Sequence, residues 1–176
     1  SLPKFLLIHH VHQDYFRRHV PFPMNFIAAF AESKIVPAVY RNQQIITVSE
    51  SSKRDIIKLG FSRSRDIQII NPGIDSDNFT HLSPKTFHPS FLYLGRIRPY
   101  KNLDVAISAF AKVFASYPKA RLYIAGEGEG IKNLRQQSRR LEIESAVYFL
   151  GRVSEREKIH LLSSSWVMLQ PSSFEG

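Results

Sequence analysis

The sequence predicts an α/β fold with a doubly wound parallel sheet. From residue 91 onward, short apolar runs alternate with helical patterns, and the connecting loops are short. Three of the runs lead directly into glycine: Gly95, Gly126 and Gly151. Repeated strand–helix units with short connections are typical of parallel strands joined by crossover helices. With 43% hydrophobic residues among 176, the chain can bury a core.

The composition limits which kinds of site and partner the protein can have. The chain has no cysteine, which excludes disulfides and thiolate metal sites and fits a reducing compartment. No apolar run approaches the roughly 20 residues that span a bilayer. The net charge of +9 favours anionic partners, and its scattered distribution is unlike a nucleic-acid-binding tail. We expect a cytoplasmic protein, part of a longer chain since Ser1 is not a natural start, with peripheral membrane contact as an open alternative.

A strand pattern at residues 5–8 runs into a loop rich in histidine. His9, His10 and His12 could together hold a metal. No carboxylate-and-histidine framework recurs elsewhere in the sequence, so we expect no metal and favour a role in binding a sugar or phosphate.

Residues 16–40 form a rough helical pattern interrupted by Pro21, Pro23 and Pro37, which we expect to break it. Cations and large apolar residues are interspersed in and beside it: Arg17, Arg18, Phe22, Phe26, Ile27, Phe30, Lys34 and Arg41. Such a segment either lies on an anionic membrane surface or packs against its own domain, and we favour packing.

The next segment predicts a strand at 44–48, a helix at 53–59 capped by Ser51 or Ser52, and a strand at 66–70. Gly60 is expected to end the helix. A dense turn follows at residues 71–75, and apolar periodicity then disappears up to Pro89. We place the domain boundary here, giving domains at residues 1–80 and 81–176.

The second domain alternates regularly. Strands are predicted at 91–94, 121–125, 147–150 and 166–169, and helices at 103–117, 131–141 and 155–162. Ser154 and Glu157 have the spacing of a capping box for the last helix.

The loop after the strand at 91–94 has the chemistry of a phosphate site. Arg96, Arg98 and Lys101 follow Gly95 within six residues, and Asn102 precedes a helix. A helix N-terminus favours an anion, and Arg and Lys both bind phosphate oxygens. A solvated basic loop is the alternative. Ligands of doubly wound sheets bind beyond the carboxyl ends of the strands, so we expect a site built from residues 95–101, 126–130, 151–153 and 172–176.

Several segments resemble the retaining glycosyltransferases of family 4. In the first domain, residues 47–55 (TVSESSKRD) resemble its "VS…S…D" segment, and residues 69–75 (IINPGID) resemble its "IPNGID" link with the central order reversed. In the second, the likeness covers residues 91–103 ("LGRL…KGLD"), 124–128 ("IAGDGP"), 147–153 ("V.FLGRV") and 171–176 ("PSxxEGFG").

The resemblance implies the GT-B architecture, in which two Rossmann-like domains face each other. Residues 1–80 would then be the end of the acceptor-side domain, and residues 81–176 a truncated nucleotide-sugar-binding domain. The expected donor is a nucleotide-diphosphate sugar, with UDP- or GDP-sugars favoured, and no metal or other cofactor is expected.

The resemblance also assigns roles to residues. Arg96 and Lys101 would hold the diphosphate, and Glu175 would bind hydroxyls of the donor sugar, with backbone N–H groups of the adjoining glycine loop at Gly176. Arg152 and Val153 would lie near the nucleotide base. Gly95, Gly126 and Glu127 would complete the donor site, and His10, with His9 as an alternative, would reach the sugar from the first domain.

The predicted function is sugar transfer with retention of anomeric configuration onto a glycan or lipid-linked acceptor, in polysaccharide or glycolipid synthesis. The second motif glutamate of the family is absent, so this stretch of chain is expected to be catalytically incomplete. A non-catalytic basic module that binds nucleic acid or anionic lipid is an alternative, as is a GT-B-shaped epimerase. We expect no nucleic acid, because Phe91, Tyr93, Tyr123 and Phe149 alternate within strands as core residues do.

Overall fold

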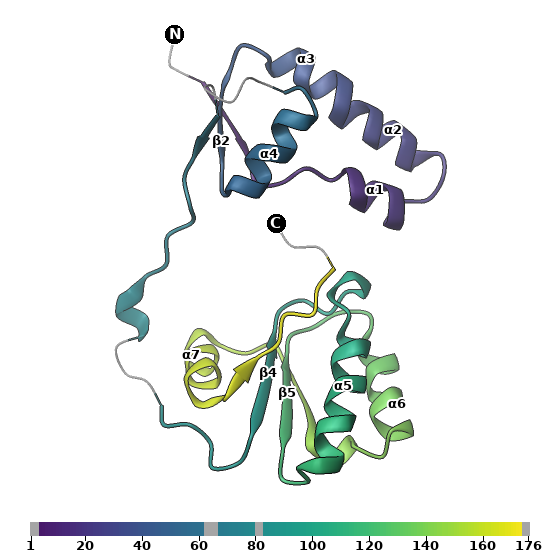
Figure 1. Cartoon of the computed structure of the whole chain (residues 1–176), viewed down its shortest axis with the longest axis vertical. Coiled ribbons are helices and arrows are strands. Elements are labelled where there is room, and N and C mark those ends of the chain that lie inside the picture. The colour runs from purple at the N-terminus through teal and green to yellow at the C-terminus, as the bar shows by residue number, and fades with distance from the viewer. Residues whose placement is uncertain (1–3, 62–66, 80–82, 174–176) are drawn as a thin grey trace. The chain divides into compact units, whose positions relative to one another are not determined.

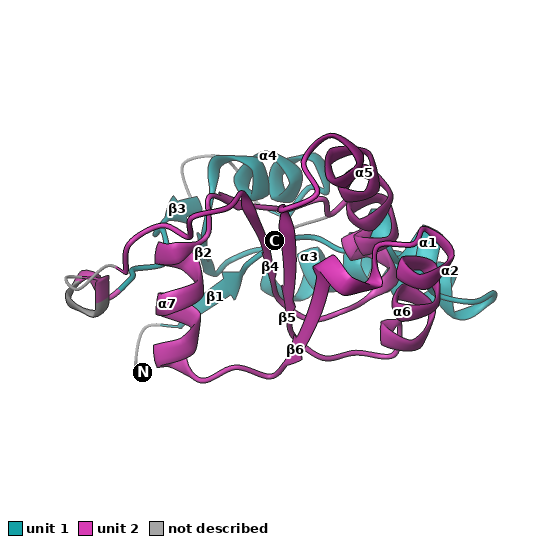
Figure 2. Cartoon of the chain, turned by 90° about the horizontal axis from the view of Figure 1, so that it is seen from below, with its two compact units in different colours: residues 1–74, 176 teal, residues 75–175 magenta. Residues whose placement is uncertain are grey.

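The computed structural model describes residues 4–61, 67–79 and 83–173. The chain forms two compact units, one ending at Ile74 and the other running from Asp75 to Glu175 (Figure 2). The sequence places the domain boundary slightly later, between residues 80 and 81.

The first unit is a parallel sheet with helices packed on it. Its strands lie in the order β1-β2-β3, with bounds β1 Phe5–Ile8, β2 Gln44–Thr47 and β3 Ile67–Ile69. The helix α4 (Glu50–Lys58) contributes Ile56 to a small core with Ile45, Phe61 and Ile67. All four of these side chains are buried.

A helical run separates β1 from β2 (Figure 1). It comprises α1 (Gln13–His19), α2 (Met24–Phe30), a π-helical segment (Ala31–Ile35) and α3 (Val36–Tyr40). The expectation that Pro37 breaks the helix is wrong, because Pro37 lies inside α3. Pro37 is the second residue of α3, and the first turn of a helix tolerates a missing N–H. The residue before it, Val36, donates its N–H to the carbonyl of Ala31, five residues earlier, as in a π-helix.

The start of α4 also differs from the prediction. Ser49, not Ser51 or Ser52, is the N-cap, since its extended backbone lets its hydroxyl accept the N–H of Ser52 at 3.2 Å. Ser52 is buried instead and donates its hydroxyl to the carbonyl of His9 at 2.7 Å. Gly60 follows the helix end with φ of 75°, as expected of a residue that terminates a helix.

The second unit is a four-stranded parallel sheet in the order β6-β5-β4-β7. Its strands are β4 Ser90–Leu94, β5 Arg121–Ala125, β6 Val147–Gly151 and β7 Val167–Met168. The helices α5 (Leu103–Ser116) and α6 (Ile131–Arg140) cover one face, and α7 (Glu155–Ser164) covers the other (Figures 1 and 2). This confirms the doubly wound parallel sheet, whose strand order reverses between β4 and β7.

The core of the second unit lies between the sheet and α5. The ring of Phe91 on β4 meets that of Phe110 on α5 at 5.8 Å, edge to face. Tyr93, two residues further along β4, is 1% exposed on the same side. Outside this core, Tyr123 and Tyr148 stack on each other at 5.3 Å, on the adjacent strands β5 and β6.

The predicted capping box of α7 is confirmed. The Ser154 hydroxyl accepts the N–H of Glu157 at 3.3 Å, and the Glu157 carboxylate accepts the N–H of Ser154 at 2.8 Å. Hydrogen bonds from Ser154 lower the pKa of Glu157 below its ordinary value. Across the described residues, no helix is both long and apolar enough to cross a bilayer.

We expect Phe110→Ala to destabilise the second unit. Phe110 is 2% exposed and its loss leaves a cavity under β4, so the free energy of unfolding should fall by about 3 kcal/mol. Urea unfolding followed by circular dichroism measures this. Val105→Ala on the same helix, at a side chain that is 57% exposed, is the control and should change stability by less than about 0.5 kcal/mol. Equal unfolding midpoints for the two variants would show that Phe110 is not a core residue.

Candidate active site

The carboxyl ends of β4, β5 and β6 form one hydrogen-bonded edge. The N–H of Gly95 bonds the carbonyl of Ala125 at 3.0 Å, and the N–H of Gly126 bonds the carbonyl of Gly151 at 2.7 Å. A Cβ on Gly126 would lie 1.8 Å from the carbonyl oxygen of Gly95, and its φ of +148° disfavours any side chain. The first residues of the two loops therefore touch backbone to backbone.

The two loops also contact each other two residues further along each chain segment. The N–H of Ile97 bonds the carbonyl of Glu127 at 2.8 Å, and a Cβ on Gly128 would lie 1.9 Å from the carbonyl oxygen of Ile97. Ile97 itself is 2% exposed and anchors its loop in the core. The loops at 95–101 and 126–130 thus form a single packed surface.

The three cations of the first loop have different surroundings. Arg98 forms an ion pair with Glu129 at 2.5 Å, so much of its charge is neutralised locally. Arg96 is exposed and, within the described residues, has no ion-pair or hydrogen-bonding partner for its side chain. Its backbone is held by the buried Tyr93, whose hydroxyl donates to the Arg96 carbonyl at 2.8 Å.

Lys101 lies at the end of a 3₁₀ turn (Pro99–Lys101) just before α5. Its backbone N–H bonds the carbonyl of Arg98 at 3.0 Å, and its ammonium lies 5.2 Å from the centre of the Tyr100 ring. Asn102, the next residue, has a left-handed backbone conformation with φ of 49° and is the N-cap of the 14-residue helix α5. The loop is therefore folded tightly enough to place Arg96 and Lys101 on the same edge.

The segment after β7 is tied to this loop. The amide of Asn102 donates to the carbonyl of Pro171 at 2.9 Å. Ser173 bonds the carbonyl of Tyr100 through its backbone N–H at 3.0 Å and its hydroxyl at 3.2 Å. Residues about 70 positions apart thus meet where the strand order reverses. Sequence reasoning identified neither Tyr93, which fixes the cationic loop, nor Ser173 as an anchor.

The structure describes some of the other predicted site residues but not all of them. Glu127, Arg152 and Val153 lie in the loops that follow β5 and β6, and Arg152 is exposed with no side-chain partner among the described residues. Glu175 and Gly176 lie outside the residues that the structure describes, so their predicted contacts are not tested. His10 belongs to the first unit.

The histidines of the first unit follow β1, and they contact α4, each other and the π-helical segment. The carbonyl of His9 accepts the Ser52 hydroxyl, and the rings of His10 and His12 lie 4.4 Å apart. The His12 ring lies 3.3 Å from the carboxylate of Glu32, a residue that sequence reasoning missed. Burial lowers the pKa of His10, the neighbouring His12 and His9 lower it further, and Glu32 acts in the opposite direction. The described residues contain no group of three or more metal-binding side chains.

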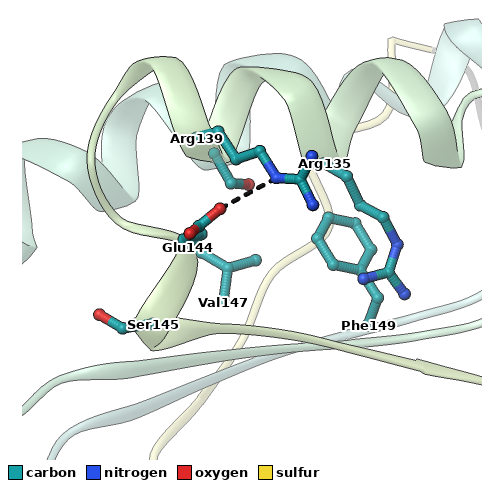
Figure 3. Close-up of a pocket in the computed structure, with 7 residues that line it drawn as sticks. Arg135, Arg139, Glu144, Ser145, Val147 and Phe149 are labelled. Atoms are coloured by element: carbon teal, nitrogen blue, oxygen red, sulfur yellow. Dashed lines mark hydrogen bonds and ion pairs between the residues drawn. The ribbon is translucent and has the colours of Figure 1, made fainter.

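One open pocket lies away from these loops. Figure 3 shows an open pocket of about 370 Å³ between α6 and the start of β6. Arg139 in its wall pairs with Glu144 at 3.0 Å, and Arg135 lies over the ring of Phe149 at 4.7 Å. Because Val147 opens β6, this pocket faces the amino ends of the strands and contains none of the predicted site residues.

Comparison with known proteins identifies the family. Residues 77–176 match the profile described as Glycosyl transferases group 1. The chain belongs to this family. The alternative of a non-catalytic basic module receives no support.

Related group 1 glycosyltransferases are much longer than this chain. Glycogen synthase of Mycobacterium tuberculosis is 30% identical over 139 residues, which is 78% of this chain but 34% of that protein. The alpha-monoglucosyldiacylglycerol synthase of Streptococcus pneumoniae is 32% identical over 90 residues, 49% of this chain and 20% of that protein. The chain thus spans about a third of the length of the first of these relatives.

Solved structures confirm the GT-B fold of this group 1 glycosyltransferase chain. WaaG, a glycosyltransferase involved in lipopolysaccharide biosynthesis, superimposes with a TM-score of 0.77 at 16% identity, over 99% of this chain and 52% of that one. Anabaena HepE, solved in complex with UDP and glucose, gives a TM-score of 0.72 at 20% identity, over 98% and 47% of the two chains.

We expect the glycine at position 126 to be essential for the joined loops. Gly126→Ala places a methyl group against the Gly95 carbonyl, so the free energy of unfolding should fall by about 3 kcal/mol or more. Gly151→Ala is the matched control, because φ is also positive there but no atom lies within 4 Å of the added Cβ. It should cost about 1 kcal/mol, and urea unfolding measures both. Similar losses in both variants would contradict the steric argument.

Proposed function

We propose that the protein transfers a sugar from a nucleotide-diphosphate donor to an acceptor hydroxyl with retention of anomeric configuration, as in family 4. The bond between sugar C1 and the diphosphate oxygen breaks, a bond from C1 to the acceptor oxygen forms, and the hydroxyl proton is released. The observation that carries the proposal is the tie between the cationic loop at 95–102 and the segment at 171–173, at the reversal of strand order.

The diphosphate is assigned to Arg96 and Lys101. Arg96 is free to turn its guanidinium toward an anion, and Lys101 lies on the last turn before α5. The N-terminus of this helix adds a favourable dipole and unpaired N–H groups. These groups would stabilise the negative charge that develops on the departing diphosphate, without a requirement for a metal.

The donor sugar is assigned to Glu175, with Gly176, and to His10 of the first unit. The assignment of Glu175 and Gly176 rests on the resemblance of residues 171–176 to the family 4 motif. Arg152 and Val153 are assigned to the nucleotide base. In this proposal residues 1–80 belong to the acceptor-side domain and residues 81–176 to the donor-side domain.

The donor class is proposed from a structurally similar protein. The structurally similar HepE was solved with UDP and glucose, which favours a UDP-sugar, with a GDP-sugar as the second candidate. A thermal-shift series with UDP-, GDP- and ADP-sugars on the full-length protein ranks them. If none of these nucleotide sugars raised the melting temperature and none supported transfer, the proposal would be refuted.

We expect Arg96→Ala and Lys101→Ala each to reduce transfer by about a hundredfold in the full-length enzyme, or about 3 kcal/mol in the barrier. The fold should be unaffected, because neither side chain is buried. Initial rates with the best donor measure the loss. Lys119→Ala, an exposed lysine in the turn that precedes β5, is the control and should leave the rate unchanged. Near wild-type turnover in both site variants would contradict the assignment.

We also infer contact with an anionic membrane, which suits a lipid-linked acceptor. Large apolar side chains are exposed on and beside α2: Phe22 at 78%, Phe26 at 67% and Phe30 at 60%. Exposed cations accompany them along α1 to α3: Arg17, Arg18, Lys34 and Arg41. Apolar side chains that insert and cations that meet anionic headgroups are the two requirements of an interfacial segment.

Sedimentation with lipid vesicles tests the membrane contact. Full-length protein should sediment with vesicles of phosphatidylglycerol and phosphatidylcholine, and less with phosphatidylcholine alone. The double variant Phe22→Ala, Phe26→Ala should bind at least about tenfold more weakly, since two rings no longer insert. Phe87→Ala, at a side chain that is 90% exposed in the other unit, should bind as wild type does. Equal binding to both vesicle types would refute the contact.

A further inference from the structure

Glu32 joins the helical run to the histidine loop across 20 residues of sequence. Its carboxylate accepts the backbone N–H of His12 at 2.7 Å and lies 3.3 Å from Nδ1 of the same residue. The amide of Gln13 donates to its other oxygen at 3.0 Å. The Glu32 side chain is only 15% exposed. A largely buried carboxylate with three donors around it holds those donors in one arrangement.

The backbone at Glu32 explains why the side chain reaches this loop. Glu32 lies in the π-helical segment, where the N–H of Val36 bonds the carbonyl five residues earlier at Ala31. A π turn shifts the angular position of its side chains relative to the α-helix on either side. Such single turns are frequent at functional sites. Gln13 adds a second tie between these elements, since its amide also donates to the carbonyl of Ala29 at 3.0 Å.

The fixed His12 ring in turn sets the surroundings of His10. The ring of Phe16 stacks on that of His12 at 5.7 Å, with 26° between the planes. The ring of His10 lies 4.4 Å from the ring of His12. The backbone below is anchored as well, because Thr47 donates to the carbonyl of Ile8 at 2.8 Å and Ser52 donates to that of His9. His10 therefore packs against the ring of His12, which Glu32 in turn contacts.

From these contacts we propose that Glu32 is a positioning residue, which holds the His12 ring and through it the neighbouring ring of His10. The proposal rests on the proposed function, since His10 is assigned there to the sugar. Glu32 has no role in that assignment, and its contacts among the described residues are within the first unit.

The charges around His10 agree with this role. The titratable groups that act on it are His9, His12 and Glu32, and burial is the largest influence. Because the pKa of His10 is lowered, its ring is neutral at pH 7 and can both donate and accept a hydrogen bond. A neutral ring with a fixed orientation suits a sugar hydroxyl, which also donates and accepts.

Two substitutions in the full-length enzyme test the positioning. Glu32→Gln keeps the shape and one acceptor but loses the charge, and should lower kcat about tenfold to a hundredfold with little change in donor KM. Glu32→Asp keeps the charge on a shorter arm and should recover part of the loss. Glu50→Gln, at an exposed glutamate in the first turn of α4, is the matched control and should leave kcat unchanged.

Histidine NMR titration gives a readout that does not depend on transfer. Glu32 opposes the lowering of the His10 pKa, so Glu32→Gln should lower that pKa further, whereas Glu50→Gln should not change it. An unchanged His10 pKa in Glu32→Gln would overturn the coupling, and so would wild-type kcat in that variant. If the wild type itself transfers no sugar but the His10 pKa responds, the proposed function fails while the coupling between Glu32 and His10 stands.

Discussion

The site depends on one steric constraint: two backbone segments approach more closely than any side chain allows. Residues 126–128 lie directly against residues 95–97, and a Cβ at either Gly126 or Gly128 would come within 2 Å of a carbonyl oxygen. Backbone hydrogen bonds between the segments follow from this contact. Because both loops begin at the ends of buried parallel strands, the sheet fixes their position and the glycines permit them to join. The cations of the first loop therefore extend from a rigid base.

The same constraint determines which charges remain available to a ligand. Once the loops are joined, Glu129 lies beside Arg98 and pairs with it, while Arg96 has no such partner within the described residues. An exposed ion pair contributes little to stability, but it makes the paired cation less available to bind an anionic ligand. The net charge of +9 is thus a poor guide to binding, because local pairing decides which of the cations can act.

Much of the fold could be predicted because it depends on local patterns. The strands, the glycines that end them, and the capping box of Ser154 and Glu157 each follow from spacing within a few residues. The misses involve long-range contacts. Ser49 replaces Ser52 as the N-cap because Ser52 is buried against His9, 43 residues away. Pro37 lies in the first turn of α3, directly after a π-helical segment that the sequence pattern does not reveal. Glu32 lies within the rough helical pattern of residues 16–40, and only tertiary contacts reveal its three donors. Glu175 lies outside the described residues and stays a prediction.

The two candidate groups are held in different ways, and the difference fits the proposed chemistry. In the second unit the backbone is rigid while the Arg96 side chain is exposed, which suits a diphosphate whose charge grows as it departs, since a long flexible cation can follow that charge. In the first unit the side chains themselves are fixed, by stacking and by a buried carboxylate. A sugar hydroxyl offers only weak, directional bonds, so a neutral imidazole must be oriented before the sugar arrives if it is to contribute. Under the proposed function, an exposed cation for the leaving group and a neutral His10 ring for the sugar would be complementary requirements of one transfer reaction.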